Sequence, residues 1–147
     1  MRILVDADAC PVKNIIEEVA ELYKLKVIMY IDTSHELNNT KSEVVVVSKG
    51  IDSVDLKIVS DVKEGDLVIT NDFGLASVLL TKKAYVMSPN GLVFTNDNID
   101  RLLFERHIVK ENVRNSKRVK NIKKRTKEND KAFKLELINL LNSKLSD

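Results

Sequence analysis

Short apolar runs alternate with helix-like segments along most of this chain. The runs rich in β-branched residues predict strands at 2–6, 26–31, 43–47, 67–70, 84–88 and 92–94. Apolar residues at helical spacing predict helices after Pro11, over 53–62 and over 73–82. Apolar strands that alternate with helices are typical of a mostly parallel sheet covered on both faces. We therefore predict an α/β fold, a three-layer α/β/α sandwich.

In the C-terminal third of the chain, two predicted helices flank a segment rich in cations. A helix is expected from about Asn96, and apolar residues at helical spacing predict another over about 128–145 that docks on the body. Between them, the segment 110–127 holds many cations and few apolar residues. A chain of 147 residues is the size of one ordinary domain, so we expect a single domain over 1–147.

Composition argues against several classes of protein for this chain. No apolar run approaches the roughly 20 residues that cross a bilayer, and the first residues lack the pattern of a signal peptide, so we expect a cytoplasmic protein without membrane contact. Cys10 is the only cysteine, which excludes an internal disulfide and a cysteine-rich zinc site. A buried Cys10 thiol is favoured over a reactive one. The oligomeric state stays open.

The charge is divided unevenly along the chain. Residues 1–100 carry 10 Lys/Arg and 16 Asp/Glu, whereas residues 101–134 carry 13 and 4. An acidic body beside a basic segment suggests a nucleic-acid partner, RNA more than DNA, although a solvated basic helix explains the charge equally well. The cations expected to bind the phosphate backbone are Arg114, Lys117, Arg118, Lys120, Lys123, Lys124 and Arg125.

Acidic residues gather where strands of the predicted sheet end. Asp6 ends the first strand, Asp8 follows two residues later, and Asp72 comes directly after the strand at 67–70. Ligands of parallel α/β sheets bind beyond the carboxyl ends of the strands. Carboxylates that converge there repel one another by roughly 4 kcal/mol per close pair at an effective dielectric constant of about 20. A divalent cation removes that cost, and carboxylate oxygens favour Mg²⁺ or Mn²⁺.

Further polar residues complete the predicted site. The expected metal ligands are Asp6, Asp8, Asp55 and Asp72, and Asp52, Thr70 and Asn71 are expected to form a secondary shell. A hydrated divalent cation activates water and offsets charge during phosphodiester cleavage. Taken singly, Asp52, Asp55 and Asp72 are also well explained as residues that stabilise helix N-termini.

Three sequence blocks resemble a known family. VDADACPV at 5–12, GDLVITNDFGLA at 65–76 and SPNGLVFT at 88–95 are similar to the YaiI/YqxD family of uncharacterised bacterial proteins, with a weaker match of NDKAFKLEL at 129–137. The family is regarded as PIN-like, a superfamily of metal-dependent nucleases. The resemblance implies catalytic roles for Asp6, Asp55 and Asp72. It does not extend to SKRVKNIKKRTK at 116–127, where relatives tend to have Gly and Pro.

The expected function is therefore a metal-dependent nuclease, and two alternatives stay open. VDADA also resembles the D-x-D motif of haloacid-dehalogenase-like phosphatases, with Asp6 as nucleophile, Asp8 as acid and Thr70 in the second motif. No suitable lysine and no late acidic pair accompany that motif. The other alternative is a non-catalytic RNA-binding module whose acids only stabilise helix ends.

Overall fold

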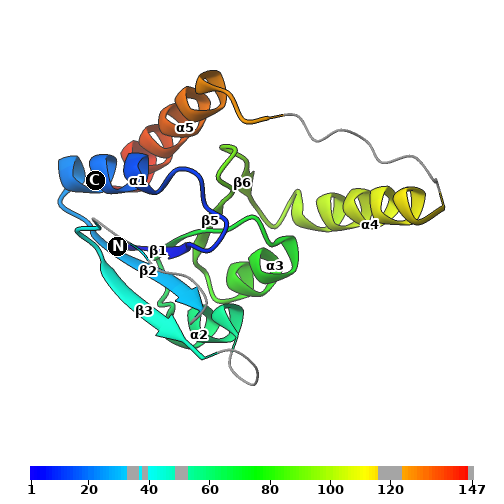
Figure 1. Cartoon of the computed structure of the whole chain (residues 1–147), viewed down its shortest axis with the longest axis horizontal. Coiled ribbons are helices and arrows are strands. Elements are labelled where there is room, and N and C mark those ends of the chain that lie inside the picture. The colour runs from blue at the N-terminus through cyan, green and yellow to red at the C-terminus, as the bar shows by residue number, and fades with distance from the viewer. Residues whose placement is uncertain (33–36, 38–39, 49–52, 116–123, 146–147) are drawn as a thin grey trace.

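The computed structural model describes residues 1–32, 37, 40–48, 53–115 and 124–145 (Figure 1). The side chains of residues 114 and 115 are not described. In chain order, the elements are β1 (Arg2–Asp6), α1 (Lys13–Tyr23), β2 (Lys26–Asp32), β3 (Glu43–Val47), α2 (Val54–Asp61), β4 (Leu67–Ile69), α3 (Phe73–Thr81), β5 (Tyr85–Met87), β6 (Val93–Phe94), α4 (Ile99–Asn115) and α5 (Lys127–Leu145).

The strands form one sheet in the order β3-β2-β1-β4-β5-β6, and β6 is its antiparallel member. The parallel ladders place Leu4 of β1 opposite Ile28 of β2 and Val68 of β4. All three side chains are buried, which explains why these strands are apolar throughout. The strand order reverses between β1 and β4, where ligands of open α/β sheets usually bind.

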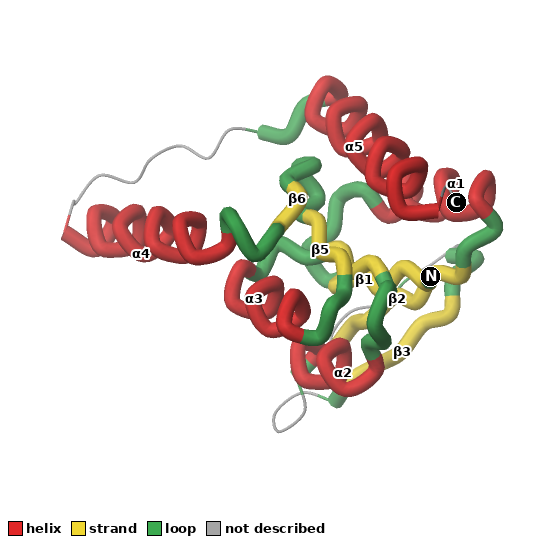
Figure 2. The backbone as a smooth tube through the Cα atoms, turned by 180° about the vertical axis from the view of Figure 1, so that it is seen from behind, coloured by secondary structure: helices red, strands yellow, loops and turns green. Residues whose placement is uncertain are grey.

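Helices cover both faces of the sheet, as the sequence predicts. Helices α1 and α5 lie over one face, and α2 and α3 lie over the other (Figures 1 and 2). Ile16 of α1 and Phe133 of α5 are fully buried in the first core, and Ile58 of α2 and Leu79 of α3 are fully buried in the second. The three-layer α/β/α prediction is therefore confirmed.

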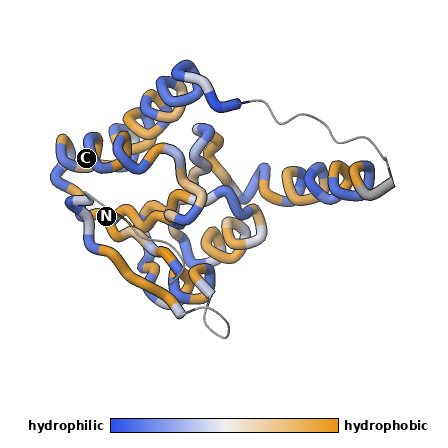
Figure 3. The backbone as a smooth tube through the Cα atoms, viewed as in Figure 1, coloured by the Kyte–Doolittle hydropathy of each residue, from blue (hydrophilic) through white to orange (hydrophobic). Residues whose placement is uncertain are grey.

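The predicted elements agree with the structure except at their ends. The C-terminal helix begins at Lys127, and α4 begins at Ile99 and takes in the first residues of the basic segment. The far end of α4 extends away from the body, and apolar and polar positions alternate along it (Figures 1 and 3). Within the described residues, no helix is long and apolar enough to span a membrane.

A buried ion pair fixes the amino edge of the sheet, opposite the predicted site. Arg2 Nη2 of β1 lies 2.7 Å from Asp66 Oδ2, directly before β4, and Asp66 is only 4% exposed. Asp66 also accepts hydrogen bonds from the backbone N–H groups of Arg2 and Lys63. Burial raises the pKa of Asp66, but these hydrogen bonds outweigh burial and hold the pKa below its ordinary value.

Candidate active site

Residues from β1 and from the end of β4 meet at the carboxyl edge where the strand order reverses. Asp6 ends β1, and Thr70 directly follows β4 and is fully buried. Thr70 Oγ1 donates a hydrogen bond of 2.9 Å to Asp6 Oδ2 and accepts one of 3.1 Å from the backbone N–H of Asp72. Thr70 therefore links Asp6 to the segment that begins α3.

Asp72 has a structural role and also faces the predicted site. Its Oδ1 accepts a hydrogen bond of 3.0 Å from the backbone N–H of Leu75, so Asp72 caps the N-terminus of α3. A Cβ atom at Gly74 would come within 3.3 Å of the same oxygen, so glycine keeps this side of the carboxylate open. The cap expected from the sequence is present, and Asp72 also lines a pocket at this edge.

Asp55 lies in the first turn of α2, but Ser53 caps that helix through a hydrogen bond from the Leu56 N–H. Partial burial, a hydrogen bond to the Asp72 carboxylate and the negative charges of Asp72 and Asp6 raise the pKa of Asp55 to about 6. Below about pH 6, Asp55 is therefore protonated and shares this proton with the Asp72 carboxylate, which comes from a different part of the chain. A residue that only stabilised a helix terminus would not need such an acidic neighbour.

Asp6 and Asp8 extend this acidic group across the ends of β1 and β2. Burial raises the pKa of Asp6, and the charges of Asp8 and Asp72 add to the rise, whereas the hydrogen bond from Thr70 opposes it. Asp8 accepts the backbone N–H of Asp32, at the end of β2, at 3.3 Å to Oδ2. The four predicted acids of the site are thus electrostatically connected through Asp6 and Asp72.

The described residues do not form a complete metal-binding site made of protein ligands alone. No three or more His, Cys, Asp or Glu side chains there are arranged to hold a metal ion. Asp52, predicted for the secondary shell, lies outside the described residues. Asn71 is exposed and lines the same pocket as Asp6 and Asp72.

The pocket at this edge joins acidic and basic side chains. Its volume is about 590 Å³, and Asp6 and Asp72 line it from the sheet side. Arg106, His107 and Lys110 of α4 line it from the other side. The sequence analysis did not assign these three residues to the site, although Leu103, Arg106, His107 and Lys110 follow the i, i+3, i+4, i+7 spacing of one helix face.

Most of the predicted phosphate-binding cations cannot be placed. Lys117, Arg118, Lys120 and Lys123 lie outside the described residues, and so does the side chain of Arg114. Lys124 is exposed.

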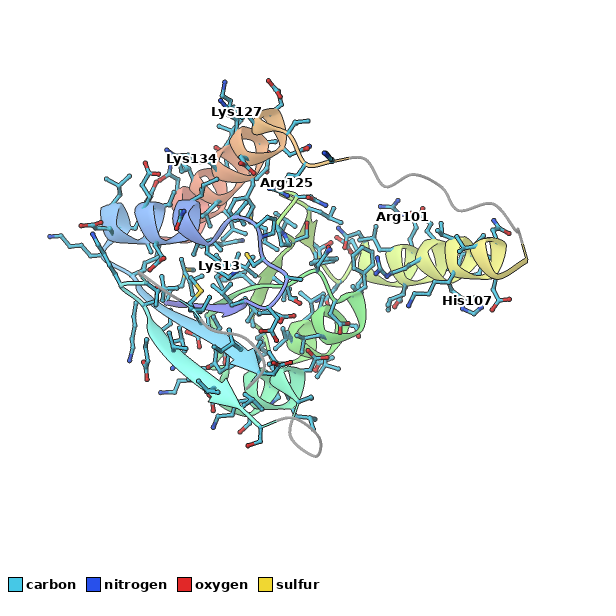
Figure 4. The ribbon with its side chains drawn as sticks, in the orientation of Figure 1. Lys13, Arg101, His107, Arg125, Lys127 and Lys134 are labelled. Atoms are coloured by element: carbon cyan, nitrogen blue, oxygen red, sulfur yellow. The ribbon has the colours of Figure 1, made fainter. Side chains whose placement is uncertain are left out.

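Arg125 is engaged within the protein at the start of α5. Its Nε lies 2.6 Å from Asp130 Oδ1, and its two terminal nitrogens donate to Asn90 Oδ1 and to the Pro89 carbonyl. Figure 4 shows Arg125 beside this junction between the turn and the start of α5. Its guanidinium therefore holds α5 against the turn between β5 and β6.

Cys10 is inaccessible, as the sequence analysis favoured. It is 4% exposed, and burial raises the pKa of its thiol. The proximity of the helix N-terminus therefore does not make this thiol a nucleophile.

Comparison with known proteins places the chain in a family. It is 53% identical over 138 residues to the UPF0178 protein of Ruminiclostridium cellulolyticum, covering 94% of this chain and 90% of the relative. It is 49% identical over 146 residues to the UPF0178 protein of Lachnoclostridium phytofermentans, covering 97% and 98%. No solved structure matches the chain. The family model described as "Uncharacterized BCR, YaiI/YqxD family" matches residues 4–143, and the protein therefore belongs to the YaiI/YqxD family.

Proposed function

We propose that this protein is a divalent-metal-dependent nuclease of the PIN-like type, cleaving phosphodiester bonds in RNA in preference to DNA. The observation that carries the proposal is the group of acids at the point where the strand order reverses. Asp6, Asp8, Asp55 and Asp72 come from three separate parts of the chain, and the charges of their neighbours in this group contribute to the raised pKa values of Asp6 and Asp55. Ionising these clustered carboxyl groups costs folding free energy, and groups with such perturbed pKa values are characteristic of functional sites.

The chemistry of these donors fits Mg²⁺ or Mn²⁺. Both are hard cations that favour carboxylate oxygens, and Mg²⁺ at phosphate-processing sites is typically held by one or two carboxylates together with waters and substrate phosphates. A set of three protein ligands is therefore not required. The hydrogen-bonded carboxyls of Asp55 and Asp72 would hold the ion in place of their shared proton, with Asp6 beside them. When bound, the ion would supply activated water and neutralise charge on the phosphate.

The chain's own residues orient this site. Thr70 occupies Oδ2 of Asp6, which leaves Oδ1 for a cation or for a proton from the attacking water. The α3 cap fixes Asp72 through its Oδ1, and the backbone N–H of Asp32 fixes Asp8. These hydrogen bonds fix the orientations of the Asp6, Asp72 and Asp8 carboxylates. A site that positions a metal ion and its substrate needs such fixed groups.

A cleavage assay with matched variants tests the proposal. Labelled RNA and DNA would be incubated with Mg²⁺, Mn²⁺ or chelator, beside a small phosphate monoester. Asp55→Asn and Asp72→Asn should each lower the rate on RNA by about 100-fold, because each removes charge that positions the ion. Asparagine is itself a good cap, so Asp72→Asn should preserve α3. Asp97→Asn is the control, since Asp97 is exposed and lies outside the pocket lining.

The same assay separates the two alternatives. The Thr70–Asp6 hydrogen bond also suits a haloacid-dehalogenase-like phosphatase with Asp6 as nucleophile, and that enzyme would release phosphate from the monoester and leave RNA intact. A non-catalytic RNA-binding module would bind labelled RNA equally with metal and with chelator and would cleave neither polymer. Metal-dependent RNA cleavage that survives both Asp→Asn variants would refute the site assignment.

A further inference from the structure

The face of α4 that lines the pocket carries positive charge that the described residues do not pair with a carboxylate. Arg106 and Lys110 are four residues apart and line the pocket together, and such like-charged pairs cost a few tenths of a kcal/mol. Among the described residues, no carboxylate lies within ion-pair distance of either side chain. On another face of the same helix, Arg101 pairs with Glu105 at 3.2 Å. Within the described residues, α4 therefore pairs a cation with a carboxylate away from the pocket, whereas its two cations that line the pocket have no such partner.

One of these cations is held in place by packing. The Arg106 guanidinium carbon lies 4.8 Å from the centre of the Phe73 ring, and Phe73 packs edge-on against Phe94 at 5.1 Å. Phe73 is the first residue of α3 and directly follows Asp72. The guanidinium is therefore anchored next to the carboxylate proposed to hold the metal. An anchored arginine loses little entropy when it binds phosphate, and its planar fork matches phosphate oxygens.

We propose that Arg106, His107 and Lys110 form a phosphate-binding site that holds the backbone of a single-stranded nucleic acid across the pocket from Asp6 and Asp72. This inference rests on the proposed function, because it names the substrate contacts of the same pocket. His107 belongs to the set because it lines the pocket and its ring N–H can donate to a phosphate oxygen. Figure 4 shows His107 on the projecting part of α4.

The shape and lining of the pocket favour a single strand. A volume of about 590 Å³ is within the range of small-ligand sites and admits a nucleotide or two rather than a rigid duplex. The aromatic ring of Phe73 is already engaged by Arg106 and Phe94, so base stacking on it is restricted. Contacts to phosphate therefore dominate, and binding should depend strongly on salt and weakly on base sequence.

Binding in the absence of metal provides the test. The affinity of a labelled single-stranded RNA of about 12 nucleotides would be measured by fluorescence anisotropy in EDTA over a salt series. Each phosphate contact contributes about −0.7 to the slope of log K against log salt for single strands. Arg106→Gln/Lys110→Gln should make the slope shallower by about 1.4. Lys110→Gln, which leaves the Arg106–Phe73 contact intact, should make it shallower by about 0.7.

The control removes the same charge from other surfaces. Arg101→Gln/Lys131→Gln changes two exposed cations outside the pocket lining, so the slope should stay at the wild-type value. An equal change in both double variants, or no metal-free binding by the wild type, would overturn the proposal. Equal binding of a duplex of the same length would overturn the single-strand assignment.

The two proposals fail in distinguishable ways. If the salt slopes behave as expected but no polymer is cleaved in Mg²⁺ or Mn²⁺, the phosphate site stands and the nuclease function is wrong. If RNA is cleaved but Arg106→Gln/Lys110→Gln leaves both the slope and KM unchanged, the nuclease function stands and this site is wrong. A rise in KM with kcat preserved would show that these residues bind the substrate strand equally before and during the reaction.

Discussion

Replacing Asp55 with asparagine should stabilise the metal-free protein at neutral pH. In the folded state the pKa of Asp55 is about 6, against 3.8 for an ordinary aspartate. The folded protein therefore holds this proton more tightly than the unfolded chain does. The associated stability is fully present below the unfolded pKa and is lost as the pH rises through the folded pKa. Asp55→Asn is uncharged at every pH, and its amide can still donate to Asp72.

The magnitude follows from the pKa difference after correction for solvent. At about 1.4 kcal/mol per pKa unit, a difference of roughly 2 units corresponds to about 3 kcal/mol for a fully buried group. Asp55 is only partly buried, so screening by solvent reduces the expected gain to about 1 kcal/mol. Asp55→Asn should therefore unfold at higher urea concentration than the wild type at pH 7.5, with the two nearly equal near pH 4.

Urea titrations in EDTA, followed by circular dichroism at several pH values, would measure this difference. The wild type should lose unfolding free energy as the pH rises through the folded pKa of Asp55, about 6, and the variant should lack this contribution. Asp97→Asn serves as the control and should follow the wild type. A destabilised Asp55→Asn protein at pH 7.5, or one with the wild-type pH dependence, would show that Asp55 is a structural residue and that the shared proton is not there.

Three further predictions concern the metal, the amino edge of the sheet and the docking of α5. Free Mg²⁺ at a hundred times its dissociation constant should stabilise the wild type by about 2.7 kcal/mol in thermal unfolding, and an equal gain in Asp6→Asn would exclude Asp6 as a ligand. Asp66→Asn should cost about 2 kcal/mol in urea titrations at pH 7, because it removes the charge of a buried carboxylate that pairs with the half-buried Arg2 guanidinium; a loss below about 0.5 kcal/mol would contradict this. Phe133→Ala should cost about 3 to 5 kcal/mol in the same assay, since its ring is fully buried, and a near-neutral result would mean that α5 is not docked.

The fold could be predicted from the sequence because its signals are local. Five parallel strands are short apolar runs bounded by polar turns. The helices predicted over 53–62, 73–82 and about 128–145 begin and end within one residue of these bounds. The cap at Asp72 is likewise a local pattern, an acidic residue directly before an apolar helix. The order of the strands is not local, since it depends on which apolar faces pack together.

The candidate site could be predicted only in part. Its acids are positioned by strand ends, whereas its cations are positioned by the packing of α4. Asp6 and Asp72 follow strands, and parallel strands bring their carboxyl ends to one edge whatever the loops do. Arg106 and Lys110 reach the same pocket only because of the direction in which α4 leaves the sheet, and that direction is set by tertiary packing. Ile99 is buried in the core that α2 and α3 cover, and Leu102 and Leu103 pack against it. Arg106 lies over the Phe73 ring. Charge counting pointed to the densest run of cations, after residue 113, most of which lies outside the described residues. Among the described residues, the Lys and Arg side chains that line the pocket are Arg106 and Lys110, one and two turns earlier. In this part of the chain, position on a helix face determines which cations reach the pocket beside the acids.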